Sequence, residues 1–335
     1  MKKVMLPLAI GLLVWSCGEK ESTETCAFQP ETTNKVTVDI GHFEDSVASL
    51  KSKKDVVAFF TRKAVYRDLI FKRKEYPNDS LFINEVFRKV SHPAFDTLLM
   101  ETKAVFGDGS ELEKQFEEAF TNLKYYYPDF VPPRVETVIN GLDTDLFVSD
   151  SLIVVGLDSF LGKGAKYRPN VYEYLLRQYN KENIVPSCML IYGIGNRFNK
   201  TDNTDKTVLA DMIAYGKSFY FAKHLLPCVP DSIFIWYTPE EMRGSRKNQD
   251  LIWARLVQDK VLFSTSHVVK QKYLGERPKT IDVGPDCPGR IAQFVGWQIV
   301  NAYMEENADV TLPQMMNEPS ASKIFRDSKY KPERN

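Results

Sequence analysis

Histidine is scarce in this chain, whose 335 residues contain only four: His42, His92, His224 and His267. None of them has a second histidine four residues away, so the HExxH helix of a typical zinc peptidase is missing. The five cysteines form no CxxC pair, and the acidic residues at 143, 145 and 150 do not follow the twelve-residue calcium-binding loop. The sequence therefore predicts neither a metal site nor a bound cofactor.

Signatures of nucleophilic and nucleotide chemistry are missing as well. The chain has no GxSxG elbow, and two glycines beside lysines at 162–164 do not complete the GxxxxGK(S/T) phosphate loop. One pair stays open, because Cys188 and His224 have the residue types of a cysteine nucleophile and its base. Since His224 lies near the apolar face of a predicted helix, we expect it to be a packing residue. Because these motifs are missing, we expect the protein not to be an enzyme.

Neither sign of charge is in excess, since 44 Lys and Arg residues balance 44 Asp and Glu residues. Domains that bind nucleic acid usually carry a basic excess, so we expect no nucleic-acid partner. Hydrophobic residues make up 43% and charged residues 26% of the chain, as in ordinary globular proteins. We find no internal repeat and no long linker. The prediction is a single globular domain at 41–335, helical to about 130 and with a mixed sheet–helix core over 131–335.

The N-terminus has the layout of an export signal. Lys2 and Lys3 precede an apolar run that ends at Trp15; this run is too short for a membrane span of about 20 residues but fits a signal peptide over 1–16. Residues 14–17 resemble a bacterial lipobox despite the bulky Trp15, which makes Cys17 the lipidated first residue of the mature chain. The alternative is a secreted protein with an unmodified Cys17. A polar, flexible tether is expected over 17–40.

Export would place the remaining cysteines in an oxidising compartment. Cys26, Cys188, Cys228 and Cys287 allow three pairings, and the sequence does not choose among them. Whether any two of them pair is left open.

The secondary-structure pattern changes near residue 130. Before it, amphipathic turns from about 43 to 127 indicate helices, one of which is expected to open with a capping box at Ser110 and Glu113. After it, short alternating or apolar runs at 135–139, 145–148 and 152–157 indicate strands, and a second capping box is expected at Thr238 and Glu241. The fold class is therefore predicted as α+β, mostly helical, with a small sheet packed against helices.

One helix, predicted over 204–226, organises the rest of the chain. Its apolar residues recur at helical spacing, and its opposite face carries Asp211 among small residues, which predicts burial on both sides. Asp158, at the end of a covered strand, and Arg290, on a nearly apolar helix predicted to open near 286, are likewise expected to be buried. A buried charge is costly unless it is paired. Two interpretations stay open: an internal ion pair of Arg290 with one or both Asp residues, or a polar pocket.

Several blocks of the sequence resemble the gliding-motility lipoprotein family GldB of gliding bacteria in the Bacteroidota. Together they extend over nearly all of the mature chain. The matching segments are Phe120 to Phe130 (FxxxKYYxPDF), Asp150 to Gly162 (DSLIVVGLDxFLG), Ala165 to Tyr167, Leu209 to Lys217 (LADMIxYGK), Tyr237 to Thr238, Pro288 to Ile291 with Gly296 to Val300, and Ser328 to Pro332.

The resemblance implies a lipoprotein required for gliding motility, often also for the associated secretion machinery, with no established enzymatic activity. It further implies anchoring to a membrane of the cell envelope, facing the periplasm, and partners among the other envelope proteins of the gliding machinery. The departure at 147–149, where a less bulky and more polar stretch is expected, does not affect the assignment.

The family's layout also resembles that of predicted zinc peptidases, with a short sheet, a motif helix and a second helix near a Pro-Gly pair. In that case residues 210–214 take the place of HExxH, with Ala210 and Ala214 at the histidine positions and Asp211 where glutamate belongs. A zincin-like layout that has lost its zinc ligands is thus predicted. The alternative function is an envelope hydrolase, or a binder of cell-wall fragments or small ligands, that uses this cleft.

Overall fold

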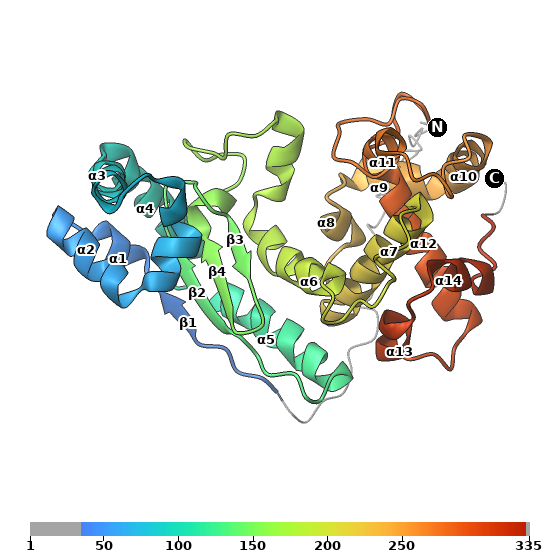
Figure 1. Cartoon of the computed structure of the whole chain (residues 1–335), viewed down its shortest axis with the longest axis horizontal. Helices are drawn as coiled ribbons and strands as arrows, with labels where there is room; N and C mark the ends of the chain where they lie inside the picture. Colours follow the sequence, from blue (N-terminus) through green and yellow to red (C-terminus); the bar gives the residue numbers. More distant parts are fainter. Residues whose placement is uncertain (1–34, 333–335) are drawn as a thin grey trace, which may run out of the picture.

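The computed structural model describes residues 35–332. Its N-terminal part, seen at the left and lower centre of Figure 1, contains one short strand and five α-helices. They are β1 (Ile40–His42), α1 (Glu44–Ala48), α2 (Lys53–Arg62), α3 (Asp79–Val90), α4 (Pro93–Phe106) and α5 (Ser110–Tyr126), with the short turns η1 (Tyr66–Ile70) and η2 (Arg73–Glu75) between α2 and α3.

A four-stranded mixed sheet follows, to which β1 contributes an edge. The remaining strands are β2 (Arg134–Val138), β3 (Leu146–Val148) and β4 (Leu152–Gly156), and the order across the sheet is β1-β2-β4-β3. The pairs β1–β2 and β2–β4 are parallel, whereas β3 runs antiparallel to β4. The three strands predicted after residue 130 are confirmed, and the mostly helical α+β fold class with them. The short strand β1 was not predicted.

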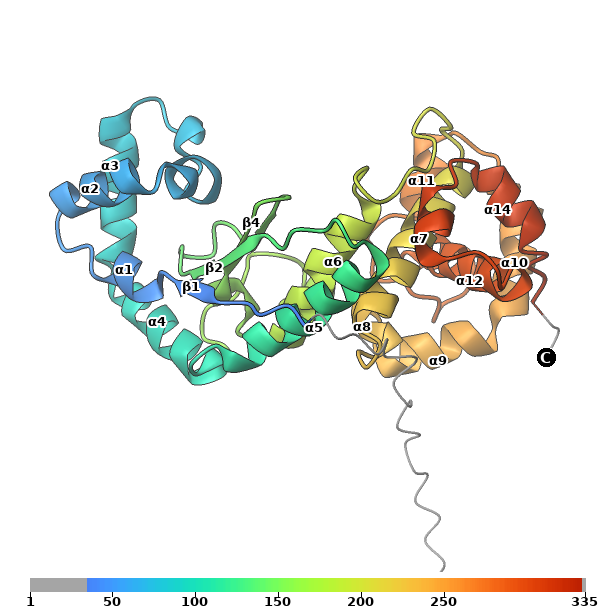
Figure 2. The same ribbon diagram turned by 90° about the horizontal axis from the view of Figure 1, so that it is seen from below.

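The C-terminal half is a helical assembly, shown at the right of Figures 1 and 2. Three short turns lead into it: η3 (Leu157–Phe160), η4 (Glu173–Gln178) and η5 (Lys181–Asn183). Its helices are α6 (Ile184–Ile194), α7 (Val208–Leu225), α8 (Asp231–Ile235), α9 (Pro239–Lys247), α10 (Gln249–Gln258), α11 (His267–Tyr273), α12 (Ile291–Glu306), α13 (Leu312–Asn317) and α14 (Ala321–Asp327).

The sheet lies between two hydrophobic cores because successive side chains of a strand point to opposite faces. Ile153 and Val155 of β4 belong to the larger core, with α5 and the C-terminal helices. Leu152 and Val154 belong to the smaller core, which is built with α1–α4. The apolar run of β4 therefore reflects burial on both faces, as the sequence indicated.

Helix α7 is the centre of the C-terminal half and packs against both α6 and α12. It begins at Val208, after Thr207 accepts a hydrogen bond from the Ala210 N–H at 3.2 Å, and ends at Leu225. The helix predicted over 204–226 is thus real but starts four residues later. Its two-sided burial explains why apolar residues occur nearly all around it.

The segment predicted as the end of a flexible tether is held in place from residue 36 onward. The backbone N–H groups of Val36 and Val38 donate to the side chains of Thr121 and Glu117 on α5, at 2.9 and 3.2 Å. These bonds place the segment along α5 before it becomes β1, so the predicted tether boundary at residue 40 lies too far along the chain.

The two predicted capping boxes have different outcomes. The box at Thr238 and Glu241 is confirmed, with both side chain-to-backbone bonds present at the start of α9. The box at Ser110 is wrong, because α5 begins at Ser110 itself after Gly109, with no side-chain cap. The Glu113 carboxylate instead accepts the Ile40 N–H at 3.4 Å, so tertiary contact with β1 replaces the local cap.

The predicted signal peptide, the lipidated Cys17 and Cys26 lie outside the described residues. Cys228 is disulfide-bonded, whereas Cys188 and Cys287 are free thiols. Within residues 35–332, no helix combines the length and the apolar character that crossing a membrane requires. The predicted zincin-like layout stays a prediction.

Candidate functional site

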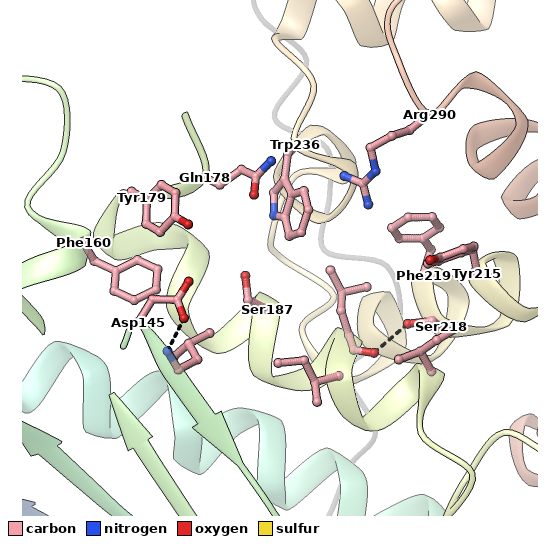
Figure 3. Close-up of a pocket in the computed structure, with 14 residues that line it drawn as sticks. Asp145, Phe160, Gln178, Tyr179, Ser187, Tyr215, Ser218, Phe219, Trp236 and Arg290 are labelled. Atoms are coloured by element: carbon pink, nitrogen blue, oxygen red, sulfur yellow. Dashed lines mark hydrogen bonds between the residues drawn. The ribbon is translucent and has the colours of Figure 1, made fainter. Parts of the chain in front are cut away.

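A pocket of about 300 Å³ lies between the edge of the sheet and the C-terminal helices. Figure 3 shows residues from both halves of the fold pointing into it. Its walls come from β3, η3 and η4 on one side, from α6 and α7 below, and from the ends of α8 and α12 on the other side. The lining residues are Asp145, Leu146, Phe160, Gln178, Tyr179, Ser187, Leu190, Ile191, Ile194, Tyr215, Ser218, Phe219, Trp236 and Arg290.

Arg290 forms the cationic end of this pocket. Only 7% of the residue is exposed, and its guanidinium donates to the Ile235 carbonyl at 2.9 Å and to Gln293 Oε1 at 3.0 Å. Its Nε atom lies 3.3 Å from Glu276, whose side chain is partly exposed. Burial lowers the pKa of Arg290, while Glu276 opposes that shift. Because an arginine keeps its proton in proteins, the pocket holds a positive charge.

Trp236 stands beside this cation, with the Arg290 guanidinium carbon 4.2 Å from its ring centroid. Both residues have left-handed backbone conformations, with φ of 58° at Trp236 and 61° at Arg290. Such conformations are uncommon for residues other than glycine and concentrate at functional sites. The indole Nε1 atom of Trp236 is buried without a hydrogen-bond partner.

The opposite end of the pocket is anionic. Asp145 precedes β3, and its carboxylate accepts its neighbour's N–H, from Leu146, at 2.7 Å. The Tyr179 side chain lines the pocket near the same carboxylate; burial, followed by the charge of Asp145, raises the pKa of Tyr179 to about 12. Figure 3 places Asp145 and Arg290 on opposite sides of the pocket.

Apolar side chains and two serines line the middle of the pocket. Phe160, Leu190 and Phe219 supply the apolar walls. The Ser218 hydroxyl donates to the Leu190 carbonyl at 2.8 Å, whereas the Ser187 hydroxyl points toward the space between Asp145 and Trp236 (Figure 3). The pocket is therefore apolar along its length and oppositely charged at its ends.

The structure places only one of the three predicted site residues in this pocket. Arg290 lines it, but it precedes α12 as the cap residue instead of lying on a helical stripe. The helix predicted to open near 286 begins only at Ile291, because a positive φ at a non-glycine residue such as Arg290 leaves no periodic signal.

Asp158 is fully buried and organises the loop between β2 and β3. Its carboxylate accepts the N–H groups of Asn140, Gly141 and Leu142, the shortest at 2.7 Å. Burial raises the pKa of Asp158 to about 6, and the backbone hydrogen bonds oppose this shift. Its partners are therefore backbone amides, and the expected ion pair with Arg290 is not formed.

Asp211 lies near the surface and not between packed helices as predicted. Its side chain is 36% exposed and forms an ion pair of 2.6 Å with Lys270 of α11. The small residues around Asp211 on α7 therefore do not enclose a buried carboxylate. The predicted pairing with Arg290 is replaced by separate partners, Lys270 for Asp211 and Glu276 for Arg290.

The other candidates for chemistry are held in structural contacts. Cys188 is completely buried, and burial raises the pKa of its thiol well above the usual range. The His224 ring stacks on Tyr220 with centroids 4.0 Å apart, and its Nδ1 atom bonds to the Tyr220 carbonyl. Burial lowers the pKa of His224. Among the described residues, no group of three or more His, Cys, Asp and Glu side chains could hold a metal ion.

Most lining residues of the pocket escaped the sequence reasoning, and two of them matter most for its ends. Asp145 was considered only as a calcium ligand, and Trp236 was not considered at all. A weak signal existed for Trp236, since it comes just before the capping box that opens α9, where a sharp change of direction is expected.

Comparison with known proteins adds one match. A family model described as gliding motility protein GldB matches residues 25–332, which include every residue of the pocket. No curated protein and no solved structure matches the chain.

Proposed function

The chain belongs to the GldB family of gliding motility proteins, and from this we propose that it is a lipid-anchored component of the gliding machinery in the cell envelope. In this proposal Cys17 carries the anchor, the globular body faces the periplasm, and the protein acts by binding other envelope proteins without catalysing a reaction. The family membership supports the role in motility, and the signal peptide and lipobox-like pattern of the sequence support the anchor.

The single observation that best supports protein–protein contact is a group of exposed apolar side chains around α11. Phe263, Val268 and Ile281 are 68%, 74% and 66% exposed, and we call them the α11 patch. Lys272, one turn after Val268, pairs at 2.8 Å with Asp282, the neighbour of Ile281, so the loop after α11 folds back beside it. A contiguous group of exposed apolar side chains is typical of interaction sites, and we propose that these three residues form one.

The side chains that could react are already hydrogen-bonded or buried, which supports a role without catalysis. A nucleophile and its base need to lie within hydrogen-bond reach of each other, but Ser218 bonds to the Leu190 carbonyl and His224 to the Tyr220 carbonyl. The free Cys188 thiol is buried, and this burial disfavours its thiolate form. These groups serve the packing of α6 and α7.

Capture of partners from native envelopes tests the proposal. The lipidated protein with Phe263→Ser, Val268→Ser and Ile281→Ser should lose its envelope partners and fail to restore gliding to a strain that lacks the protein. The physical reason is that removing the apolar area removes most of the hydrophobic driving force for association. A separate Cys17→Ser variant should leave the membrane fraction.

A matched control uses three apolar residues of similar exposure on or near the N-terminal half: Val57, Met100 and Val131. Their replacement by serine should leave both partner capture and gliding intact. Full gliding and unchanged partners with the α11 patch replaced would contradict the proposed surface. Equal loss in both triple variants would show that replacing any exposed apolar side chains has this effect and would also contradict the proposed surface.

A further inference from the structure

We propose that the pocket binds a short zwitterionic peptide, with the peptide carboxylate at Arg290 and Trp236 and its ammonium group at Asp145. This goes beyond a role in protein–protein contact, because the pocket is separate from the α11 patch and takes a small ligand. The proposal rests on three features of the pocket: unused donors at one end, an acceptor at the other and apolar walls between them.

The cationic end has hydrogen-bonding capacity that the protein does not use. Each terminal nitrogen of Arg290 carries two N–H groups; one from each is used, by Ile235 and Gln293. The buried Nε1–H of Trp236 has no acceptor at all. A buried donor without a partner costs free energy, and a carboxylate satisfies several such donors at once. This end therefore suits a ligand carboxylate.

Glu276 does not occupy that position. It contacts Arg290 through Nε, at 3.3 Å, and its side chain is 41% exposed, whereas the terminal nitrogens are turned toward Trp236 and toward the side of Phe219 and Tyr215 (Figure 3). Its charge holds the guanidinium in place and leaves the unused N–H groups for a ligand.

The anionic end requires a different ligand group. The Asp145 carboxylate has two oxygens with about four acceptor positions, of which the Leu146 N–H takes one. The Ser187 hydroxyl points into the same space (Figure 3). A positively charged donor such as an ammonium group complements this end, and a second carboxylate would be repelled by it.

The size and walls of the pocket favour a dipeptide or tripeptide. Its volume of about 300 Å³ is at the lower limit of ligand pockets. The separation of the charges on opposite sides favours a ligand whose own charges are separated by backbone, which extends about 3.3–3.6 Å per residue. Phe160, Leu190 and Phe219 would contact an apolar peptide side chain.

Calorimetry on the full-length lipidated protein in lipid nanodiscs tests this proposal. The probes are the dipeptides leucyl-leucine and leucyl-phenylalanine, each also with an acetylated N-terminus or an amidated C-terminus, and octanoate as an apolar anion without an ammonium group. Either blocked end should weaken binding at least tenfold, and octanoate should bind at least tenfold more weakly than the free dipeptides.

Two variants assign the ends of the ligand. Asp145→Asn should abolish the preference for a free over an acetylated N-terminus and keep the preference for a free C-terminus. Trp236→Phe, which keeps an aromatic ring beside Arg290 but removes Nε1–H, should weaken the preference for a free C-terminus. Asp211→Asn is the matched control for Asp145→Asn, since Asp211 lies outside the pocket in an ion pair with Lys270, and it should change neither preference.

Four results would overturn the inference: no binding of either dipeptide, equal binding of free and blocked dipeptides, octanoate binding as tightly as the dipeptides, or an Asp145→Asn protein that still rejects the acetylated form. None of these results depends on gliding or on envelope partners, so failure here is distinguishable from failure of the proposed α11 patch.

Discussion

Gly216 of α7 and Gly296 of α12 lie backbone against backbone. A Cβ atom on Gly216 would lie 2.3 Å from the Gly296 carbonyl oxygen, and one on Gly296 would lie 2.0 Å from the Met212 carbonyl oxygen. Both distances are far below van der Waals contact, so only glycine permits this approach of the two helices. The contact fixes α12, and Arg290 at its start, against the helix that forms the floor of the pocket.

The first prediction concerns this contact. Gly296→Ala should lower the free energy of unfolding by about 1–3 kcal/mol or more, because the new methyl group forces α7 and α12 apart in a close-packed core. Urea unfolding followed by circular dichroism measures the change.

Gly244→Ala in α9 is the matched control, since a Cβ there meets nothing within 4 Å. It should stabilise the protein by about 0.5–1 kcal/mol, because alanine has the higher helix propensity. A Gly296→Ala protein as stable as the wild type would show that the helices can separate without cost.

The second prediction concerns Asp158. Asp158→Asn should destabilise the protein by about 1–3 kcal/mol, because the amide nitrogen replaces an acceptor that faces three backbone N–H groups. Thermal unfolding measures the loss. Asp150→Asn, at an exposed ion pair with Arg197, should have a much smaller effect. Equal stabilities of the two variants would contradict the structural role of Asp158.

The third prediction is a pH dependence that arises from Lys217. This side chain is fully buried, and its Nζ atom donates to the carbonyls of Met316 and Glu318. Burial lowers the pKa of Lys217 from its ordinary value of 10.5 to about 8. Between these two values the unfolded chain binds more protons than the folded protein, so the stability from this group rises with pH.

Lys217→Met removes the titrating group. The free energy of unfolding of the wild type, relative to the variant, should therefore increase from pH 7.5 to pH 9.5. Urea titrations at three pH values across this window measure it. If the difference in free energy of unfolding between the wild type and the variant stayed constant or fell with pH, this would contradict a buried Lys217 whose charged form is destabilised.

The fourth prediction separates Asp211 from the pocket. Asp211→Asn should cost at most about 1 kcal/mol, because its ion pair with Lys270 is partly exposed to solvent. Cells with this variant should contain normal amounts of the protein and should glide. Lost gliding at normal abundance would instead give Asp211 a function that its position does not suggest.

Local patterns in the sequence were enough for much of the fold. The strand β4 follows from an apolar run, α7 from helical spacing and the start of α9 from Thr238, Pro239 and Glu241. These features depend on residues within one or two turns of each other, which is why they can be read locally. The strand β1 could not be predicted locally, because its three residues are too few to show a periodic pattern. They gain their hydrogen bonds from β2 and α5.

The candidate site was predicted only in part for the same reason. The sequence by itself determined that Asp158 and Arg290 are buried, since both stand beside apolar runs. Only the tertiary structure decided which partners they have. Asp158 accepts hydrogen bonds from backbone amides, Asp211 pairs with Lys270 of α11, and Arg290, at the start of α12, lines the pocket. Pairings of this kind depend on where the helices lie, and close contacts such as that of Gly216 with Gly296 set those positions. Because such contacts join residues that are far apart in the chain, no local sequence pattern encodes the pairings.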